Sequence, residues 1–158
     1  MALLPSAEDV EAWLEADGWF PGRDIGARAD ELIGIRVRDA SAQGAPLTVF
    51  PRAVEFVRSF GELRLADPAD AGRALWLRPT IGYDGDAADI GELAAGLGKA
   101  LFPVGLETGE NGILLVDDDG RLFYLHHTGG YFLGETPASA FAQWLSGRAM
   151  QDAEDFFA

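Results

Sequence analysis

GILLVDDDGRLFYLHHTGGYFLGETPASAF, residues 112–141, carries the strongest structural signal in this chain. Two apolar runs, 113–116 and 122–125, flank an acidic turn that contains Asp119-Gly120, a dipeptide typical of tight β-hairpins. Both runs are apolar over consecutive residues, as in strands that are buried on both faces. The pattern predicts a hairpin at the centre of a sheet, with helices packed over it.

Two helices are expected before residue 40. Ser6 can cap the first, with Asp9 at the position where a capping box places an acid or amide, and Gly18 ends it. The second is expected from about Asp24, a suitable cap, to about Arg36. Apolar residues recur at helical spacing in both segments, so each helix should bury one face.

Three more helices follow from proline and spacing signals. Pro51 fits the first turn of a helix that Gly61 stops, and Thr136-Pro137 gives a cap followed by a first-turn proline. Between them, the acidic segment 80–89 leads into a helix with apolar residues at helical spacing over 90–97. Short strands are expected at 63–65, 75–77, 101–105 and 131–134, the third of them short or at an edge because Pro103 cannot donate to a ladder.

Composition points to a single globular domain. The 158 residues are 48% hydrophobic and 24% charged, a length that supports one core. No apolar run approaches the roughly 20 residues that span a bilayer, and the first residues carry acids where a signal peptide needs a basic region. There is no cysteine, which fits a reducing compartment. We expect a cytoplasmic protein without membrane contact.

Charge is the most unusual compositional feature. Acids number 26 against 12 Lys and Arg, which gives a formal charge of −14. Nucleic acid and anionic membranes would repel such a chain. Two explanations stay open: the charge serves solubility alone, or it steers the protein toward a basic protein partner.

Clusters of acids and histidines invite a metal interpretation that their spacing does not support. Asp84, Asp86 and Asp89 lack the patterned series of a calcium loop, so we interpret them as helix-entry acids. The acids 117–119 diverge in a tight turn, which we expect to be solvated. His126-His127 should project to opposite faces of a strand, one inward and hydrogen-bonded and the other exposed. We expect no metal and no cofactor.

Catalytic motifs are also missing. The chain has no cysteine nucleophile, no phosphate-binding loop, no dinucleotide fingerprint and no serine in a nucleophile elbow. A hydrolase that uses two carboxylates depends on three-dimensional geometry, so this alternative stays open at the level of sequence. The favoured expectation is a protein that is not an enzyme.

The order of motifs resembles a known family. A helix with Trp13 is followed by GWFPGR, VFPRAVEFVRSFGELRL, LWLRPTIGYDGD, LGKALFPVGLETGENGILLVDDDGRLFYL and GGYFLGETPASAFAQWL. Over residues 10–147 this order is similar to that of the SUKH superfamily, and within it to the third SUKH subgroup of bacterial immunity proteins. Each motif is weak alone, and their shared order and spacing carry the resemblance.

The resemblance implies an α+β fold with a central, bent antiparallel sheet flanked by helices, in a SUKH-like single domain over residues 1–147. An acidic tail, 148–158, follows, and its Phe156-Phe157 pair is either flexible or docked on the body or a partner. The long connector 35–47 is a departure from the family pattern. By resemblance the protein is a cytosolic antidote that binds and blocks a cognate toxin, commonly a nuclease or nucleic-acid deaminase. The alternative is a non-catalytic adaptor or scaffold of the SUKH type.

The family has no short site motif to transfer, so the partner surface is predicted from the residues. Tight binding by an inhibitor would depend on a few aromatic anchors ringed by charge. The predicted partner-binding residues, all in expected loops or strand ends, are Asp84, Asp86, Glu107, Glu110 and Tyr131. The partner is expected to be a basic toxin domain; its identity, the affinity and the oligomeric state are not determined by the sequence.

Overall fold

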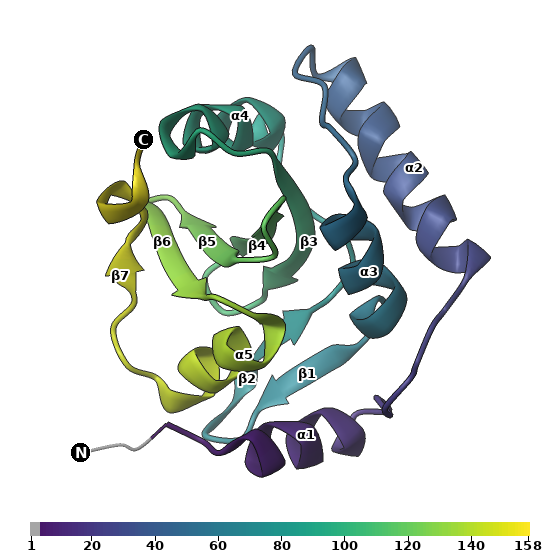
Figure 1. Cartoon of the computed structure of the whole chain (residues 1–158), viewed down its shortest axis with the longest axis vertical. Coiled ribbons are helices and arrows are strands. Elements are labelled where there is room, and N and C mark those ends of the chain that lie inside the picture. The colour runs from purple at the N-terminus through teal and green to yellow at the C-terminus, as the bar shows by residue number, and fades with distance from the viewer. Residues whose placement is uncertain (1–3) are drawn as a thin grey trace.

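The predicted hairpin lies in the middle of the sheet in a computed structural model that describes residues 4–158 (Figure 1). Its strands are β4 (Gly112–Asp117) and β5 (Leu122–His126), and every residue of β4 is buried. Within the described residues the sheet has seven antiparallel strands in chain order. The others are β1 (Arg64–Asp67), β2 (Asp70–Trp76), β3 (Leu101–Glu107), β6 (Gly129–Gly134) and β7 (Gln151–Asp152).

Helices cover both faces of this sheet. They are α1 (Ala7–Ala16), α2 (Ala27–Ala42), α3 (Pro51–Phe60), α4 (Asp86–Leu97), α5 (Pro137–Ser146) and the 3-10 helix η1 (Ala153–Phe156). Figure 1 shows β1 and β2 turned away from the curled strands β3–β6. The predicted α+β fold with a central antiparallel sheet flanked by helices is therefore confirmed. The first three residues of the predicted domain 1–147 lie outside the described residues.

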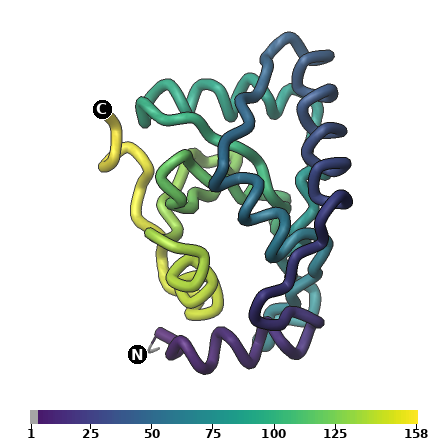
Figure 2. The backbone as a smooth tube through the Cα atoms, turned by 45° about the vertical axis from the view of Figure 1, so that its right-hand side comes forward, coloured from purple at the N-terminus to yellow at the C-terminus, as the bar shows by residue number. Residues whose placement is uncertain are grey.

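The alternating side chains of β4 explain why the strand is buried on both faces. Leu114 and Val116 belong to the larger core, which α1, α2, α3 and α5 close. Ile113 and Leu115 belong to a second core under α4, with Phe123 of the neighbouring strand. Side chains along a strand point to opposite faces in turn, so one hairpin supplies both cores. Figure 2 shows α2 and α3 side by side, with the start of α4 near the end of α2.

Three helix starts are those that the sequence predicts. The Ser6 hydroxyl accepts a hydrogen bond from the Asp9 amide, and the Asp9 carboxylate accepts one from the Ser6 amide, each at 3.1 Å. Pro51 occupies the first turn of α3. Thr136 caps α5 and forms a reciprocal pair with Ser139. These caps satisfy amide groups that have no partner within the helix.

The second helix differs from the prediction at both ends. The carboxylate of Asp24 accepts a 2.7 Å hydrogen bond from the Gly26 amide, so this acid orders the turn before the helix and Gly26 is the N-cap. At the other end α2 continues to Ala42, because Arg36 and Ala40 are buried on the same face as its earlier apolar residues. The expected connector 35–47 is therefore helical over 35–42.

Two strand predictions are also corrected. β3 is an interior strand and not an edge. β2 pairs only with the last residues of β3, so at Pro103 the strand has a neighbour, β4, on one side alone. The register between β3 and β4 shifts between Pro103 and Gly105. A proline is tolerated at such an irregularity. The strands expected at 63–65 and 75–77 are longer in the structure, 64–67 and 70–76, and they form a hairpin that turns at Pro68-Ala69.

The C-terminal residues lie against the sheet. β7 pairs with β6, and the ring of Phe156 lies 4.4 Å from that of Phe132, measured between centroids. The same ring contacts Phe123 at 6.1 Å, so the segment extends the second core. Within residues 4–158, no helix has the length and apolar character needed to cross a membrane.

Candidate partner-binding groove

A groove of about 960 Å³ opens between α4, the β5–β6 turn and the C-terminal segment. We call it the acidic groove. Its carboxylates come from segments far apart in the chain: Asp89 and Glu92 on α4, Glu110 before β4, and Asp152 and Glu154 near the C-terminus. No Lys or Arg is among the described residues that line it. The groove therefore presents concentrated negative charge that no internal cation offsets.

The acidic groove lies in the more acidic half of the chain. Residues 79–158 contain thirteen Asp and Glu but only three Lys and Arg. Two of these three bases are held by acids outside the groove: Lys99 Nζ lies 2.7 Å from Asp119 Oδ2, and Arg121 Nε lies 2.8 Å from Asp117 Oδ2. The acids that line the groove therefore give it a negative potential.

Aromatic side chains stand among these acids. Tyr83 and Phe157 line the groove and are 42% and 44% exposed, which is unusual for side chains of their size. The Tyr83 hydroxyl donates a 2.8 Å hydrogen bond to Asp89 Oδ2. Partial burial and this bond raise the pKa of Tyr83 to about 12. The phenol is therefore neutral at physiological pH and offers an apolar ring beside a carboxylate.

The β5–β6 turn forms the floor of the groove. His126 Nδ1 lies 2.9 Å from Thr128 Oγ1, which lies 2.7 Å from the Tyr131 hydroxyl, so a chain of hydrogen bonds fixes the Tyr131 ring. His126 Nε2 lies 3.1 Å from Glu110 Oε2. As predicted, one histidine is largely buried and hydrogen-bonded and the other, His127, is exposed.

The two histidines do not project to opposite faces as a regular strand would require. Their ring centroids are 3.8 Å apart. β5 ends at His126, so His127 belongs to the turn and is free of the strand alternation. Both histidines line the groove.

Asp86 is not available to a partner, although the sequence places it in an acidic loop. Its carboxylate is fully buried and pairs with Arg36 at 2.6 Å, while Gln43 donates to it at 3.1 Å. The Tyr83 amide also donates to it at 3.2 Å. Asp86 thus ties α2 to the start of α4 and holds Tyr83 at the groove. The prediction that Asp86 contacts a partner is corrected on this ground.

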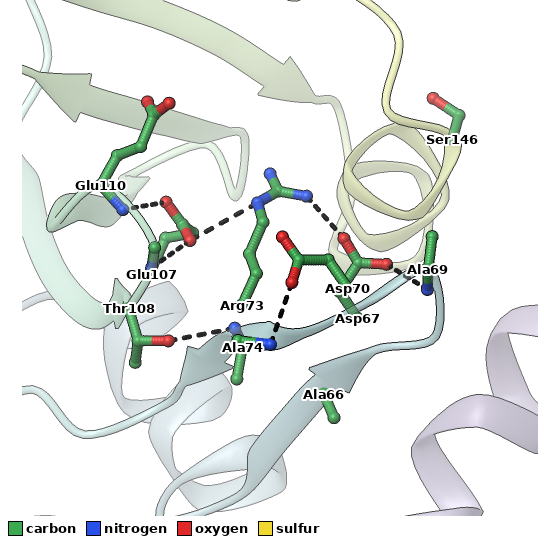
Figure 3. A network of polar contacts seen from close by, with 12 residues as sticks. Ala66, Asp67, Ala69, Asp70, Arg73, Ala74, Glu107, Thr108, Glu110 and Ser146 are labelled. Atoms are coloured by element: carbon green, nitrogen blue, oxygen red, sulfur yellow. Dashed lines mark hydrogen bonds and ion pairs between the residues drawn. The ribbon is translucent and has the colours of Figure 1, made fainter.

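Glu107 is likewise buried, with 1% exposure, and four donors surround its carboxylate; Figure 3 shows the contacts with Arg73 and Glu110. The amides of Gly109 and Glu110 donate at 2.5 and 3.1 Å, the Tyr124 hydroxyl donates at 3.0 Å, and Arg73 Nε lies 3.4 Å away. Figure 3 shows the Glu110 carboxylate pointing away from that of Glu107. Glu107 therefore orders the loop that presents Glu110, and its buried carboxylate is not accessible on the surface of this structure.

The structure brings together only part of the predicted surface. Glu110, whose side chain is 68% exposed, and Tyr131 both line the acidic groove. Asp84 is exposed next to Tyr83 in the chain but does not line the groove. The sequence-based prediction missed the other lining residues used here, which are Tyr83, Asp89, Glu92, Asp152, Glu154 and Phe157. The i, i+3 spacing of Asp89 and Glu92 on a helix was an available signal.

Metal binding finds no support in residues 4–158, where no three His, Asp or Glu side chains are arranged to hold an ion.

The acidic turn after β4 differs from the expected solvated turn in one residue. Asp117 is buried and accepts hydrogen bonds from the amides of Asp119 and Arg121 at 3.0 and 2.8 Å, while Asp118 and Asp119 are exposed. Asp117 thus shapes the hairpin turn.

Comparison with known families gives a match over most of the chain. The profile of the SUKH-3 immunity protein family matches residues 6–147. The chain belongs to the SUKH-3 family. Neither the search of curated proteins nor that of solved structures found a match. The match confirms the resemblance drawn from the order of motifs, and it covers every helix from α1 to α5 and the strands β1–β6.

The boundary of the SUKH-3 match bears on the groove. Tyr83, Asp89 and Glu110 lie inside the matched residues, whereas Asp152 and Phe157 lie beyond them. The groove is thus built partly on the shared SUKH-3 domain and partly on a segment outside the match. Membership indicates an immunity protein, a class that acts by binding and is generally not catalytic.

Proposed function

We propose that this protein neutralises a cognate bacterial toxin by binding a basic surface of that toxin in the acidic groove. Membership of the SUKH-3 immunity family supports the role of an antidote. The groove supports the binding face: five carboxylates and two half-exposed aromatic rings line it, with no Lys or Arg among its described residues. This combination is the single observation on which the proposal depends.

The chemistry of the groove favours a toxin that handles nucleic acid. Nucleases and nucleic-acid deaminases carry Lys and Arg that bind phosphates. Carboxylates in a groove offer those side chains the same charge as phosphate, so the antidote would occupy the substrate path by charge complementarity. Tyr83, Tyr131 and Phe157 would supply aromatic anchors, which commonly carry most of the affinity at an interface.

The proposed surface keeps part of the set predicted from sequence. Glu110 and Tyr131 stay in it because both line the groove, and Asp84 stays at its margin because it is exposed beside Tyr83. Asp86 and Glu107 leave it because they are buried. In their place Asp89, Glu92 and Glu154 supply the accessible charge.

Titration calorimetry against the toxin domain encoded by the neighbouring gene tests the proposal. The informative variant is Glu92→Gln/Glu110→Gln/Glu154→Gln, which removes three groove charges with little change of shape. Its matched control is Glu8→Gln/Glu11→Gln/Glu15→Gln, which removes three exposed charges from α1, on the opposite side of the molecule (Figure 1). We expect the groove variant to bind about tenfold more weakly or worse, since each rim charge contributes up to about 1 kcal/mol.

The outcomes separate the proposal from its alternative. Tight binding by the wild type and the control, with loss in the groove variant, supports a toxin-binding groove. Equal loss in both triple variants would show that net charge alone matters and would remove the groove from the proposal. Absence of toxin binding by the wild type, together with capture of several weak partners, would favour the SUKH-type adaptor.

A further inference from the structure

The residues at the C-terminus form one wall of the acidic groove. Asp152, Glu154 and Phe157 line it together with Glu110 and α4, and they belong to β7, η1 and the residue that follows η1. We call residues 151–158 the C-terminal arm. The SUKH-3 match ends at residue 147, so the arm lies outside the matched residues and contributes to the groove.

The arm is held by local contacts on its inner side. Gln151 and Asp152 pair with Phe132 and Tyr131 of β6, which joins the arm to the same strand that presents Tyr131 to the groove. Phe156 turns inward onto Phe132, and the amide of Ala158 donates a 3.0 Å hydrogen bond to the carbonyl of Gly96 on α4. The arm is therefore tied to both neighbouring walls.

The ring of Phe157 packs against Gly96, in space that a side chain at position 96 would fill. A Cβ added to Gly96 would lie 2.7 Å from the Phe157 ring, closer than side-chain contacts allow. Phe157 nevertheless remains 44% exposed and faces the groove. Of the two adjacent phenylalanines, Phe156 thus anchors the arm and Phe157 presents a ring toward the opening.

The charges of the arm do not explain its position. Asp152 and Glu154 line the same groove as the acids of α4 and Glu110, and like charges repel. Strand pairing and apolar contacts hold the arm against this repulsion. A Lys or Arg side chain placed among these carboxylates would relieve their repulsion, so the acids of the arm make the groove more selective for a cationic segment.

We infer that the C-terminal arm is a partner-contacting element of this protein, and that Phe157, seated on Gly96, inserts its exposed ring into the interface with a basic segment of the toxin. The inference rests on the proposed function, because it takes the toxin as the occupant of the groove. It adds the assignment of a binding role to a segment outside the matched domain.

Two matched pairs of variants test the arm by calorimetry with the toxin domain encoded by the neighbouring gene. Phe157→Ala removes the presented ring, and Phe20→Ala removes a comparably exposed ring, at 56%, from the turn after α1. Gly96→Ala displaces the Phe157 ring, whereas Gly91→Ala adds the same methyl to α4 where no heavy atom lies within 4 Å. Both substitutions raise the helix propensity of α4, so the Gly91→Ala control shows the effect of that change alone.

We expect Phe157→Ala to raise the Kd for the toxin about tenfold or more, and Gly96→Ala about threefold or more, with both controls within about twofold of wild type. Amide exchange at Ala158, followed by NMR without toxin, should be faster in Gly96→Ala and unchanged in Gly91→Ala, because the Gly96 carbonyl is its acceptor. Wild-type affinity in Phe157→Ala would overturn the role of the arm and leave the proposed function standing. A wild-type protein that does not bind the toxin would overturn the proposed function, and the exchange data would still report how the arm is seated.

Discussion

Arg36 Nη2 lies 2.6 Å from Asp86 Oδ2 in the interior, where the two side chains are 2% and 0% exposed. Removing one member of a buried ion pair leaves the other charged and unpaired, which costs about 3–5 kcal/mol. We expect Asp86→Ala to lower the free energy of unfolding in urea by about that amount. Asp84→Ala, two residues earlier and exposed, should change it by less than about 0.5 kcal/mol. Similar values for the two variants would contradict the structural role of Asp86.

Ionisation of Tyr124 should lower the free energy of unfolding at alkaline pH. Its buried hydroxyl donates to Glu107 at 3.0 Å, and burial, reinforced by the charge of Glu107, raises the pKa of Tyr124 above its ordinary value of 10.0. The unfolded chain loses this proton near pH 10 while the folded chain keeps it, so stability is present below pH 10 and is lost as pH rises beyond it. Tyr83, with a pKa of about 12, acts in the same direction.

Tyr124→Phe should therefore make the free energy of unfolding less steeply dependent on pH above 10. At neutral pH the variant should lose about 1–2 kcal/mol, since one hydrogen bond to a buried carboxylate is removed. Urea titrations at pH 8, 10 and 11, with Tyr131→Phe as the control, measure both effects. An unchanged slope above pH 10 in Tyr124→Phe would contradict the assignment of alkaline sensitivity to this residue.

Local sequence signals were sufficient where the relevant contacts are local. The hairpin at Asp119-Gly120 and the starts of α1, α3 and α5 depend on residues within four positions of one another, and the structure confirms them. The end of α2 depends on Ala40 and Arg36 being buried against distant segments. No local pattern reports such burial, and the helix was predicted too short.

The candidate site failed to emerge from sequence for a similar reason. Asp86 and Glu107 look like accessible loop acids until Arg36, 50 residues away, and Tyr124, 17 residues away, are placed beside them. Conversely, Asp89 and Glu154 line one groove only after the chain has folded. Sequence could report the excess of acids, while their division into structural and exposed sets required the fold.

The turn between β5 and β6 should control how well the groove is preorganised. Thr128 Oγ1 links His126 Nδ1 to the Tyr131 hydroxyl, so Thr128→Val removes both hydrogen bonds without changing the shape of the side chain greatly. We expect a three- to tenfold weaker Kd for the toxin, about 0.7–1.4 kcal/mol, because Tyr131 must then be ordered on binding. The free energy of unfolding should fall by less than about 1 kcal/mol, since these groups are exposed.

Thr48→Val is the control for this variant, because Thr48 is also exposed but lies in the connector before α3, far from the groove in the chain. It should leave the Kd for the toxin unchanged. Equal affinity in the two valine variants would show that the orientation of Tyr131 does not matter to binding.

Salt should separate charge complementarity from aromatic anchoring in the groove. Raising ionic strength from about 50 to 300 mM shortens the Debye length to well below the width of a protein face, so encounters between an acidic groove and a basic partner slow down. For the wild type we expect a marked fall in the association rate constant and a smaller change in dissociation. For Glu92→Gln/Glu110→Gln/Glu154→Gln the fall should be clearly shallower, because three of the charges that steer the partner are gone.

Phe157→Ala should instead speed dissociation while keeping the salt dependence of the wild type, since the ring carries no charge. Surface plasmon resonance at four salt concentrations measures both rate constants. If the triple variant keeps the wild-type salt dependence, the steering field originates outside the groove, and its acids serve solubility alone.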